Sequence, residues 1–424
     1  MRFLPTLVLL TAGATALQAT QGPTTFIVKD VRLFDGQSAT EHRTVLVKDG
    51  IIAEVGDGSL KVPRGVTVFD GSGKTLLPGL IDAHVHLSQN LEVNLKQAIS
   101  LGVTTVLDMW NAGERFERMK ALRISDPPNL AAVRSAGQGA TVPGGHPSQM
   151  GGPPFPTISK PEEAQAFVDA RIAEGSDWIK IIYDDLAALG MKVPTFDKAT
   201  LAALIAAAHA RGKLAVVHVL SSERARDAIE SGADGLVHLY TEPAATPGFA
   251  DTAKARGAFI IPTLIISHSL SCGMPKAVEI AADSLLRPYI EPASRKRLGA
   301  VSPSRGTPKD CDGTHATIRQ LAARGVPVLV GTDSPVPGQT YGASVHAELE
   351  ALVATGLTPT QVLAGATSAT ARAFRLEDRG SIRPGLRADL LLVEGDPTAN
   401  IRDSRRIVAI WKRGLRVERT SYGE

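Results

Sequence analysis

Five side chains that suit metal coordination stand in short apolar runs of this 424-residue chain. His84 and His86 are separated by one residue in GLIDAHVHL, so a strand here would project both imidazoles from one face. His218 in AVVHVL, His238 in GLVHLY and Asp333 in LVGTDS each come near the end of another run. Imidazole and carboxylate suit divalent ions, with Zn²⁺ expected and Mn²⁺, Co²⁺ or Ni²⁺ sharing this ligand preference. A pair of hydrogen-bonded core histidines would explain the first two residues but not the other three.

A sixth candidate is a lysine inside an apolar run. Lys180 lies in DWIKIIYDD, which predicts a strand. An ordinary ammonium group is costly to bury there without a partner. This position therefore calls for a specific partner.

The elements that must position these residues follow a repeating rhythm. Eight apolar runs, from GLIDAHVHL to VPVLVGTDS, alternate with helix-like segments such as FDKATLAALIAAAHARG. Continuous apolar runs suit parallel strands that are buried on both faces, so residues 79–375 predict a (β/α)8 TIM barrel. Such a barrel gathers its catalytic residues at the C-terminal ends of its strands, where these ligands occur. No dinucleotide-binding glycine pattern follows the first run, which disfavours an open doubly wound sheet.

The two ends of the chain have a different texture. Residues 20–78 alternate apolar and polar side chains and are broken by Asp-Gly pairs, a pattern typical of hairpins. Residues 376–424 repeat this texture. We predict a small β-sandwich domain that is assembled from both termini.

The first residues predict a secretory signal peptide. Arg2 precedes an apolar stretch that ends in small residues, so residues 1–19 would be removed and the mature chain would be secreted or periplasmic. A buried N-terminal strand or helix is the alternative; the run is shorter than the roughly 20 residues of a membrane span. In an oxidising compartment Cys272 and Cys311 could pair, and two free thiols remain the alternative. The 46 basic and 43 acidic residues form no long run of one sign, so no nucleic-acid partner is expected.

Taken together, LLPGLIDAHVHL, WIKI, VVHV, LVHL, GTDS and SIRPGLRADLLLVEGDP resemble the amidohydrolase superfamily over nearly the whole mature chain. In its two-metal members a lysine of the fourth strand is carboxylated and bridges the ions, and Lys180 matches it. The resemblance implies that His84, His86 and Asp333 bind the more buried ion, and His218 and His238 the other. A bridging hydroxide would attack the substrate carbonyl, and Asp333 would pass its proton to the leaving nitrogen.

The resemblance also implies a substrate class. The segment SAGQGATVPGGHPSQMGGPPFP predicts a mobile lid, and its GGH element, with His146, is similar to one in the carboxypeptidase-like branch of prolidases, Xaa-Arg dipeptidases and ochratoxin-hydrolysing enzymes. We therefore expect a small amide substrate, an N-acyl amino acid or dipeptide with a free carboxylate, including ochratoxin-type toxins. A homo-oligomer is expected on the same basis. Tyr183 and Tyr240 are candidate oxyanion donors, or else packed aromatic residues.

Two rival functions stay open. A mononuclear cyclic-amide hydrolase or deaminase similar to imidazolonepropionase would leave Lys180 unmodified. A binding or scaffold protein would be expected to lack several ligands, and this chain retains all six. His268 and His315 are expected in a surface or loop segment, and His346 in a helix. A carboxylate-binding arginine is expected, and the sequence does not rank the three candidates, Arg134, Arg297 and Arg305.

Overall fold

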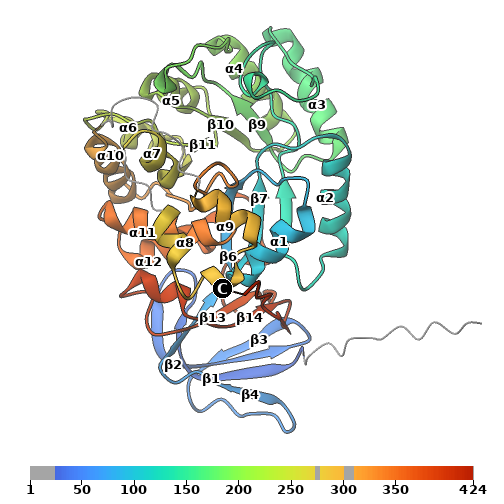
Figure 1. The fold of residues 1–424 in the computed structure, drawn as a ribbon, viewed down its shortest axis with the longest axis vertical. Helices are drawn as coiled ribbons and strands as arrows, with labels where there is room; N and C mark the ends of the chain where they lie inside the picture. Colours follow the sequence, from blue (N-terminus) through green and yellow to red (C-terminus); the bar gives the residue numbers. More distant parts are fainter. Residues whose placement is uncertain (1–23, 273–276, 300–309, 424) are drawn as a thin grey trace, which may run out of the picture.

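The computed structural model describes residues 24–272, 277–299 and 310–423. The predicted signal peptide, residues 1–19, lies outside this range and stays a prediction. Among the described helices, none has both the length and the apolar character that a membrane crossing requires. The ribbon has two parts, a sheet at one end and a larger body of strands and helices above it (Figure 1).

Strands from both ends of the chain form one mixed sheet of eight strands. Its order is β15-β14-β13-β5-β1-β2-β3, and β4 pairs with β1. The strand bounds are β1 (Phe26–Phe34), β2 (Ala39–Lys48), β3 (Ile51–Gly56), β4 (Thr67–Asp70), β5 (Lys74–Pro78), β13 (Leu390–Glu394), β14 (Ile407–Lys412) and β15 (Leu415–Arg416). This arrangement does not confirm the predicted sandwich: β5 pairs with β1 on one side and β13 on the other, which joins strands from both termini in a single sheet.

The larger body holds seven of the eight predicted barrel strands. They form a parallel three-stranded sheet, β6-β7-β8, and a parallel four-stranded sheet, β12-β11-β10-β9. Their bounds are β6 (Leu80–Val85), β7 (Val103–Asp108), β8 (Ala132–Ser135), β9 (Ile179–Ile182), β10 (Ala215–His218), β11 (Gly235–Val237) and β12 (Phe259–Ile261). The fold is TIM-barrel-like, but within the described residues these strands do not form one continuous closed ladder.

The expected eighth strand, residues 326–334, is not a regular strand. Single parallel bridges nevertheless connect Val328 to Ile260 of β12 and Ser334 to Val85 of β6. A further bridge, between Ala140 and Ile181, connects the segment that follows β8 to β9. Asp333 has a left-handed backbone (φ 60°), and Pro335, two residues later, has no N–H group to continue a ladder.

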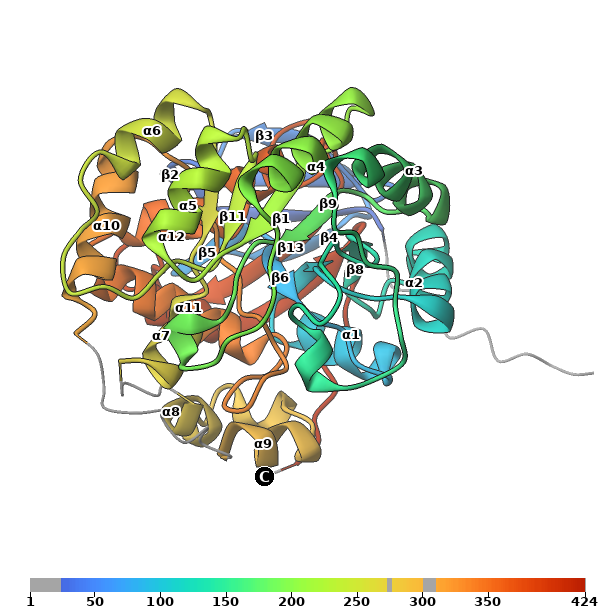
Figure 2. The ribbon, with the colours of Figure 1, turned by 90° about the horizontal axis from the view of Figure 1, so that it is seen from above.

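Helices surround these strands, as the view from above shows (Figure 2). Several begin with side-chain caps: Asp197 accepts from the backbone of Thr200, and Ser221 from that of Arg224. The helix bounds are α1 (Leu91–Ser100), α2 (Gly113–Ser125), α3 (Ala164–Glu174), α4 (Lys198–Ala210), α5 (Ser222–Glu230), α6 (Phe249–Ala255), α7 (Leu264–Leu270), α8 (Ala277–Ala282), α9 (Pro292–Gly299), α10 (Asp312–Ala323), α11 (Ala343–Ala354), α12 (Pro359–Gly365) and α13 (Ser368–Ala373). Short 3-10 helices are η1 (Ser148–Met150), η2 (Pro161–Glu163), η3 (Ala187–Leu189), η4 (Arg287–Tyr289) and η5 (Ile401–Arg405).

The two cysteines form a disulfide. Cys272 follows α7 and Cys311 precedes α10, and their Cα atoms are 5.9 Å apart. Of the two alternatives that the sequence left open, the structure has the paired one.

Candidate metal centre

Three of the predicted ligands form a compact group at the end of β6. The Nε2 atoms of His84 and His86 lie 3.1 Å from each other, and each lies 3.1 Å from Oδ1 of Asp333. Each residue can offer one ligand atom such that all three atoms lie within 4.8 Å of one another. His84 is fully buried, whereas the His86 side chain is 37% exposed. The group can hold one divalent ion with an accessible side.

The backbone around Asp333 is attached directly to β6. The amide of Asp333 donates to the carbonyl of His84 at 2.8 Å, and the amide of His86 donates to the carbonyl of Ser334 at 2.7 Å. Gly331 makes this close approach possible, because a Cβ atom at that position would lie 2.9 Å from Cβ of His84. The left-handed conformation of Asp333 then turns its carboxylate toward both imidazoles.

His218 and His238 lie beside this group. His218 is the last residue of β10, His238 directly follows β11, and their ring centres are 4.6 Å apart. Nε2 of His238 lies 3.9 Å from Oδ2 of Asp333, and its Nδ1 lies 2.6 Å from Oγ1 of Thr263. Burial lowers the pKa of His238 to about 4 and that of His218 well below its usual value. Both imidazoles are therefore neutral at pH 7, as metal binding requires.

Lys180 is buried but lacks the ion pair and hydrogen bonds that the buried Lys412 makes. Nζ of Lys412, which is 0% exposed, lies 2.5 Å from Oδ1 of Asp126 and donates to two backbone carbonyls. Lys180 on β9 is 2% exposed, and its Nζ has no hydrogen-bond partner among the described residues. Burial lowers its pKa to about 7, against the opposing influence of Asp333 and Asp108. A buried polar atom without a partner indicates that a group outside the protein chain belongs beside it.

These observations test whether the residues fit a metal centre. The donor set consists of imidazoles and a carboxylate, and Nε2 of the buried His218 also has no hydrogen-bond partner among the described residues. Imidazole nitrogen and carboxylate oxygen are ligands that divalent ions such as Zn²⁺ accept. The residues fit.

His146 reaches the centre from the predicted lid. Its ring lies 5.2 Å from that of His218, and its Nδ1 lies 2.6 Å from Nε2 of Gln149. Burial lowers the pKa of His146 to about 4, so its ring is neutral at pH 7. Together with His218, His238 and Asp333 it lines a cavity of about 150 Å³. Most of the remaining wall is apolar and includes Leu186, Leu189, Met191, Leu220, Ile266 and Leu270.

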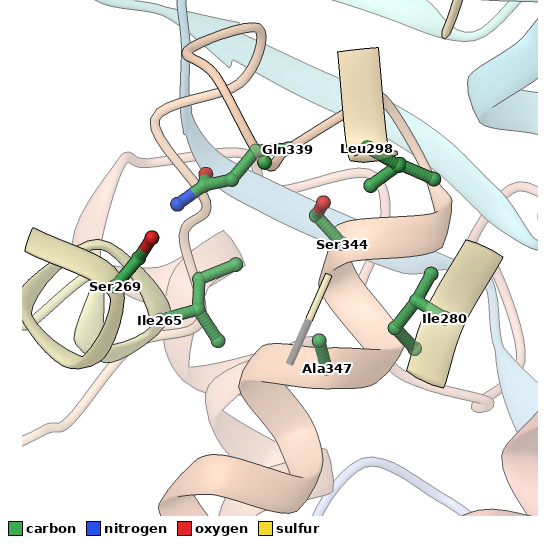
Figure 3. A pocket seen from close by; sticks show the side chains of 8 residues that line it. Ile265, Ser269, Ile280, Leu298, Gln339, Ser344 and Ala347 are labelled. Carbon is green, nitrogen blue, oxygen red and sulfur yellow. The ribbon is translucent and has the colours of Figure 1, made fainter. Parts of the chain in front are cut away.

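A second cavity lies between α7, α8, α9 and α11 (Figure 3). Ile265, Ile280, Leu298 and Ala347 contribute apolar walls to it. Its volume of about 10 Å³ is at the lower limit for one water molecule, so it is no substrate pocket.

The structure does not place Tyr183 in the centre. Its hydroxyl donates to Oδ2 of Asp227 on α5 at 3.1 Å, and the guanidinium of Arg224 lies 5.0 Å from its ring. These contacts hold the hydroxyl on α5, so Tyr183 is corrected from an oxyanion donor to a residue that packs against this helix. Tyr240 is 1% exposed and packs edge-on against Phe249 at 5.6 Å.

Other expectations also change. His268 is buried on α7 and His315 lies on α10, so neither belongs to an irregular surface segment. Of the candidate arginines, Arg134 and Arg297 do not line the catalytic cavity, and Arg305 lies outside the described residues.

Sequence reasoning missed two buried carboxylates that support the ligands. Asp82 accepts from the backbone and hydroxyl of Thr332, and Asp108 accepts from the backbone of Leu87, directly after His86. Both stand inside the apolar runs that predicted β6 and β7, where a carboxylate is costly to bury without donors. A carboxylate inside an apolar run was therefore the feature of the sequence that could have identified these two residues.

The comparison with known protein families agrees with this geometry. The family model described as "Amidohydrolase family" matches residues 75–417. The chain belongs to the amidohydrolase family. Its relatives include an imidazolonepropionase of Cereibacter sphaeroides, 25% identical over 400 residues that cover 87% of this chain and 92% of the relative. The protein is a hydrolytic enzyme that acts on carbon–nitrogen bonds.

Solved structures resemble this amidohydrolase in fold. A Xaa-Pro dipeptidase with bound methionine superimposes with a TM-score of 0.73 and 23% identity, covering 93% of this chain and 100% of the dipeptidase. An ochratoxinase of A. niger superimposes with a TM-score of 0.69 and 19% identity, covering 92% and 95% of the two chains. These likenesses support the TIM-barrel-like fold.

Proposed function

We propose that this amidohydrolase binds two divalent metal ions, expected to be Zn²⁺, bridged by a carboxylated Lys180, and cleaves N-acyl amino acids or dipeptides. The observation that carries the proposal is the buried Lys180 amine, which has no hydrogen-bond partner among the described residues. The fold likeness to a Xaa-Pro dipeptidase and an ochratoxinase supports the substrate class. Secretion and a homo-oligomeric state remain part of the proposal.

The environment of Lys180 favours carboxylation. Only a neutral amine has the lone pair that forms a bond to the carbon of CO₂, and a pKa of about 7 makes that form abundant at neutral pH. The new N–C bond gives a carbamate anion and releases one proton. An anionic oxygen pair in this position would supply the bridging ligand that the unmodified ammonium cannot.

Asp333 is the proposed proton carrier. When bound, divalent ions lower the pKa of a coordinated water and polarise the substrate carbonyl. Burial favours the neutral acid, but His84 and His86 hold the pKa of Asp333 well below its usual value, so its carboxylate is ionised. It can accept a proton from the attacking water and donate it to the leaving nitrogen, which departs as an amine.

The cavity favours an apolar substituent on the substrate. Leu189, Met191 and Leu270 line it, and its described lining includes no lysine or arginine. We therefore place an apolar acyl or side-chain group here, and any free carboxylate elsewhere. His146 lies at the edge of the cavity and would contact the amide group of the substrate.

A mononuclear cyclic-amide hydrolase or deaminase is the second candidate. The 25% identity to an imidazolonepropionase over 87% of this chain favours it. Lys180 would then carry no carbamate, and the chain would bind about one metal ion.

The experiment is a count of metal ions per chain by plasma mass spectrometry, with hydrolysis of matched acyl-amino acids, dipeptides and cyclic amides. Two ions per chain with cleavage of linear amides is the expected result. Lys180→Met should lose the bridged pair and the activity, whereas Lys254→Met, at an exposed position on α6, should retain both. A fully active Lys180→Met variant, or a single ion with cleavage of cyclic amides alone, would overturn the proposal.

A further inference from the structure

A second pair of histidines lies in direct contact outside the centre described above. Nε2 of His268 on α7 lies 2.9 Å from Nε2 of His315 on α10, and the ring centres are 5.1 Å apart. His268 is 5% exposed. Two imidazole nitrogens this close share the geometry of His84 and His86, whose Nε2 atoms are 3.1 Å apart.

The two cysteines of the disulfide have the same spacing in the sequence from the two histidines. Three residues separate His268 from Cys272, and three separate Cys311 from His315. The amide of His315 donates to the carbonyl of Cys311 at 3.0 Å, a helical i to i+4 bond, and the amide of Cys272 donates to the carbonyl of Ser267 at 3.1 Å. Cys272 directly follows the C-cap residue of α7, and Cys311 is the N-cap residue of α10. The disulfide and the imidazole pair therefore both connect the end of α7 to the start of α10.

We propose that the reduced protein binds one Zn²⁺ ion through Cys272, Cys311, His268 and His315. Two thiolates and two neutral imidazoles form a common structural zinc set. With Zn–N and Zn–S bonds of about 2.0 and 2.3 Å, tetrahedral geometry needs N···N and S···S separations of roughly 3.3 and 3.8 Å. The imidazole pair is already near that separation, and reduction releases the two sulfurs from their bond so that they can separate.

The disulfide and the zinc site exclude each other. A dithiol reductant supplies two electrons and two protons, so that its own sulfurs become joined while the Cys272–Cys311 bond breaks into two thiols. Zinc binding then releases both thiol protons to solvent. Two thiolates balance the charge of Zn²⁺, and a neutral site suits a place where both cysteines are less than a tenth exposed.

This site borders the catalytic cavity without sharing its ligands. Ser267, Leu270 and Ser271, which flank His268 and Cys272 in the chain, line that cavity. The catalytic centre contains no sulfur ligand, so a thiolate signal reports on the second site alone. The inference therefore does not depend on the proposed function.

Cobalt substitution of the full-length protein tests the proposal. A phosphine reductant opens the disulfide without adding thiolates, and Co²⁺ is then titrated into reduced and oxidised protein. We expect a near-ultraviolet thiolate-to-cobalt charge-transfer band in the reduced protein only, because Co²⁺ bound by the imidazoles and carboxylate of the catalytic centre has no thiolate ligand. Its absence from the reduced wild-type protein would overturn the proposal.

Substitution of the imidazoles distinguishes a four-ligand site from metal binding by the two thiolates alone. The double variant His268→Asn with His315→Asn keeps both cysteines, and we expect it to lose the band at Co²⁺ concentrations that saturate the wild type. His42→Asn, at an exposed histidine of β2, is the matched control and should keep the band. An unchanged band in the double variant would rule out the four-ligand site. The comparison of oxidised and reduced wild-type protein requires no substitution, so it stands even if the double variant does not fold.

Discussion

Asp82 and Thr332 are joined by two hydrogen bonds, from the backbone N–H of Thr332 at 3.0 Å and from its hydroxyl at 2.7 Å. Asp82 lies two residues before His84, and Thr332 lies directly before Asp333. The pair therefore connects the strand that carries two ligands to the segment that carries a third. That segment is not a regular strand, so it lacks a continuous ladder of backbone hydrogen bonds to β6. The two bonds to Asp82 help to position Asp333 in its place.

Thr332→Val should weaken metal binding. The valine keeps the shape of the side chain but removes the hydroxyl donor to Asp82, and supporting partners of metal ligands typically contribute about 10- to 100-fold in affinity. Metal affinity measured by competition with a chelator should fall within that range, while circular dichroism stays unchanged. Thr252→Val, at a surface threonine of α6, is the control. Equal metal affinity in Thr332→Val and the wild type would show that the backbone alone positions Asp333.

His146→Ala should impair substrate binding more than metal binding. His146 lines the cavity and contacts the ring of His218, but it is not part of the group formed by His84, His86 and Asp333. Loss of one hydrogen bond, about 1 to 1.5 kcal/mol, corresponds to a rise in KM of roughly tenfold. Steady-state kinetics and metal analysis on the same preparation check this. A loss of metal with unchanged KM would instead make His146 a ligand.

Asp184 connects two loops that form the cavity. Its Oδ1 accepts from the amide of Leu186 at 2.7 Å, and its Oδ2 accepts from the amide of Leu220 at 2.6 Å. Asp184→Asn replaces one acceptor with a donor that faces an N–H group, at a cost of about 1.5 to 3 kcal/mol. We expect KM to rise up to about tenfold, with unchanged metal content, because both leucines line the cavity.

The neighbouring Asp185→Asn is the matched control for Asp184→Asn. It removes a partly exposed ion pair to Arg224 at 2.9 Å, and such pairs contribute little. A KM that changes equally in both variants would contradict the positioning role of Asp184.

Folding stability should fall as the pH drops from about 6.5 toward 4, in part through His346. This imidazole on α11 contacts the hydroxyl of Ser404 and the carbonyl of Leu101, both at 3.0 Å. Burial, aided by Arg405, lowers its pKa from 6.5 to about 4. Between these values the unfolded chain binds more protons than the folded chain, so acid favours unfolding, by about 3 kcal/mol at most.

Denaturant titration at several pH values checks the contribution of His346. His346→Gln should flatten the loss of the free energy of unfolding between pH 6.5 and 4 relative to the wild type. Ser404→Ala keeps the imidazole buried and should keep the slope. Parallel profiles for wild type and His346→Gln would assign the acid sensitivity to other groups.

The amino-acid sequence determined much of the catalytic region, because local patterns report on strand position. The spacing of His84 and His86 predicted a shared face, and the place of His218 and His238 at the ends of apolar runs predicted their meeting at one end of the barrel. Seven of the eight predicted barrel strands are present. The amidohydrolase resemblance, carried by the same runs, agrees with the family match.

Tertiary structure decided what depends on contacts between distant segments. The sequence could not show that β5 joins strands from both termini in one sheet. Nor could it show that Asp227 accepts a hydrogen bond from the hydroxyl of Tyr183, or that His268 contacts His315. Lys180 and Lys412 both stand in apolar runs, yet only the fold supplies Asp126 and two carbonyls to one of them. Periodicity records which side of an element is buried, whereas the partner that a buried polar group finds is set by segments that the chain brings together from far away.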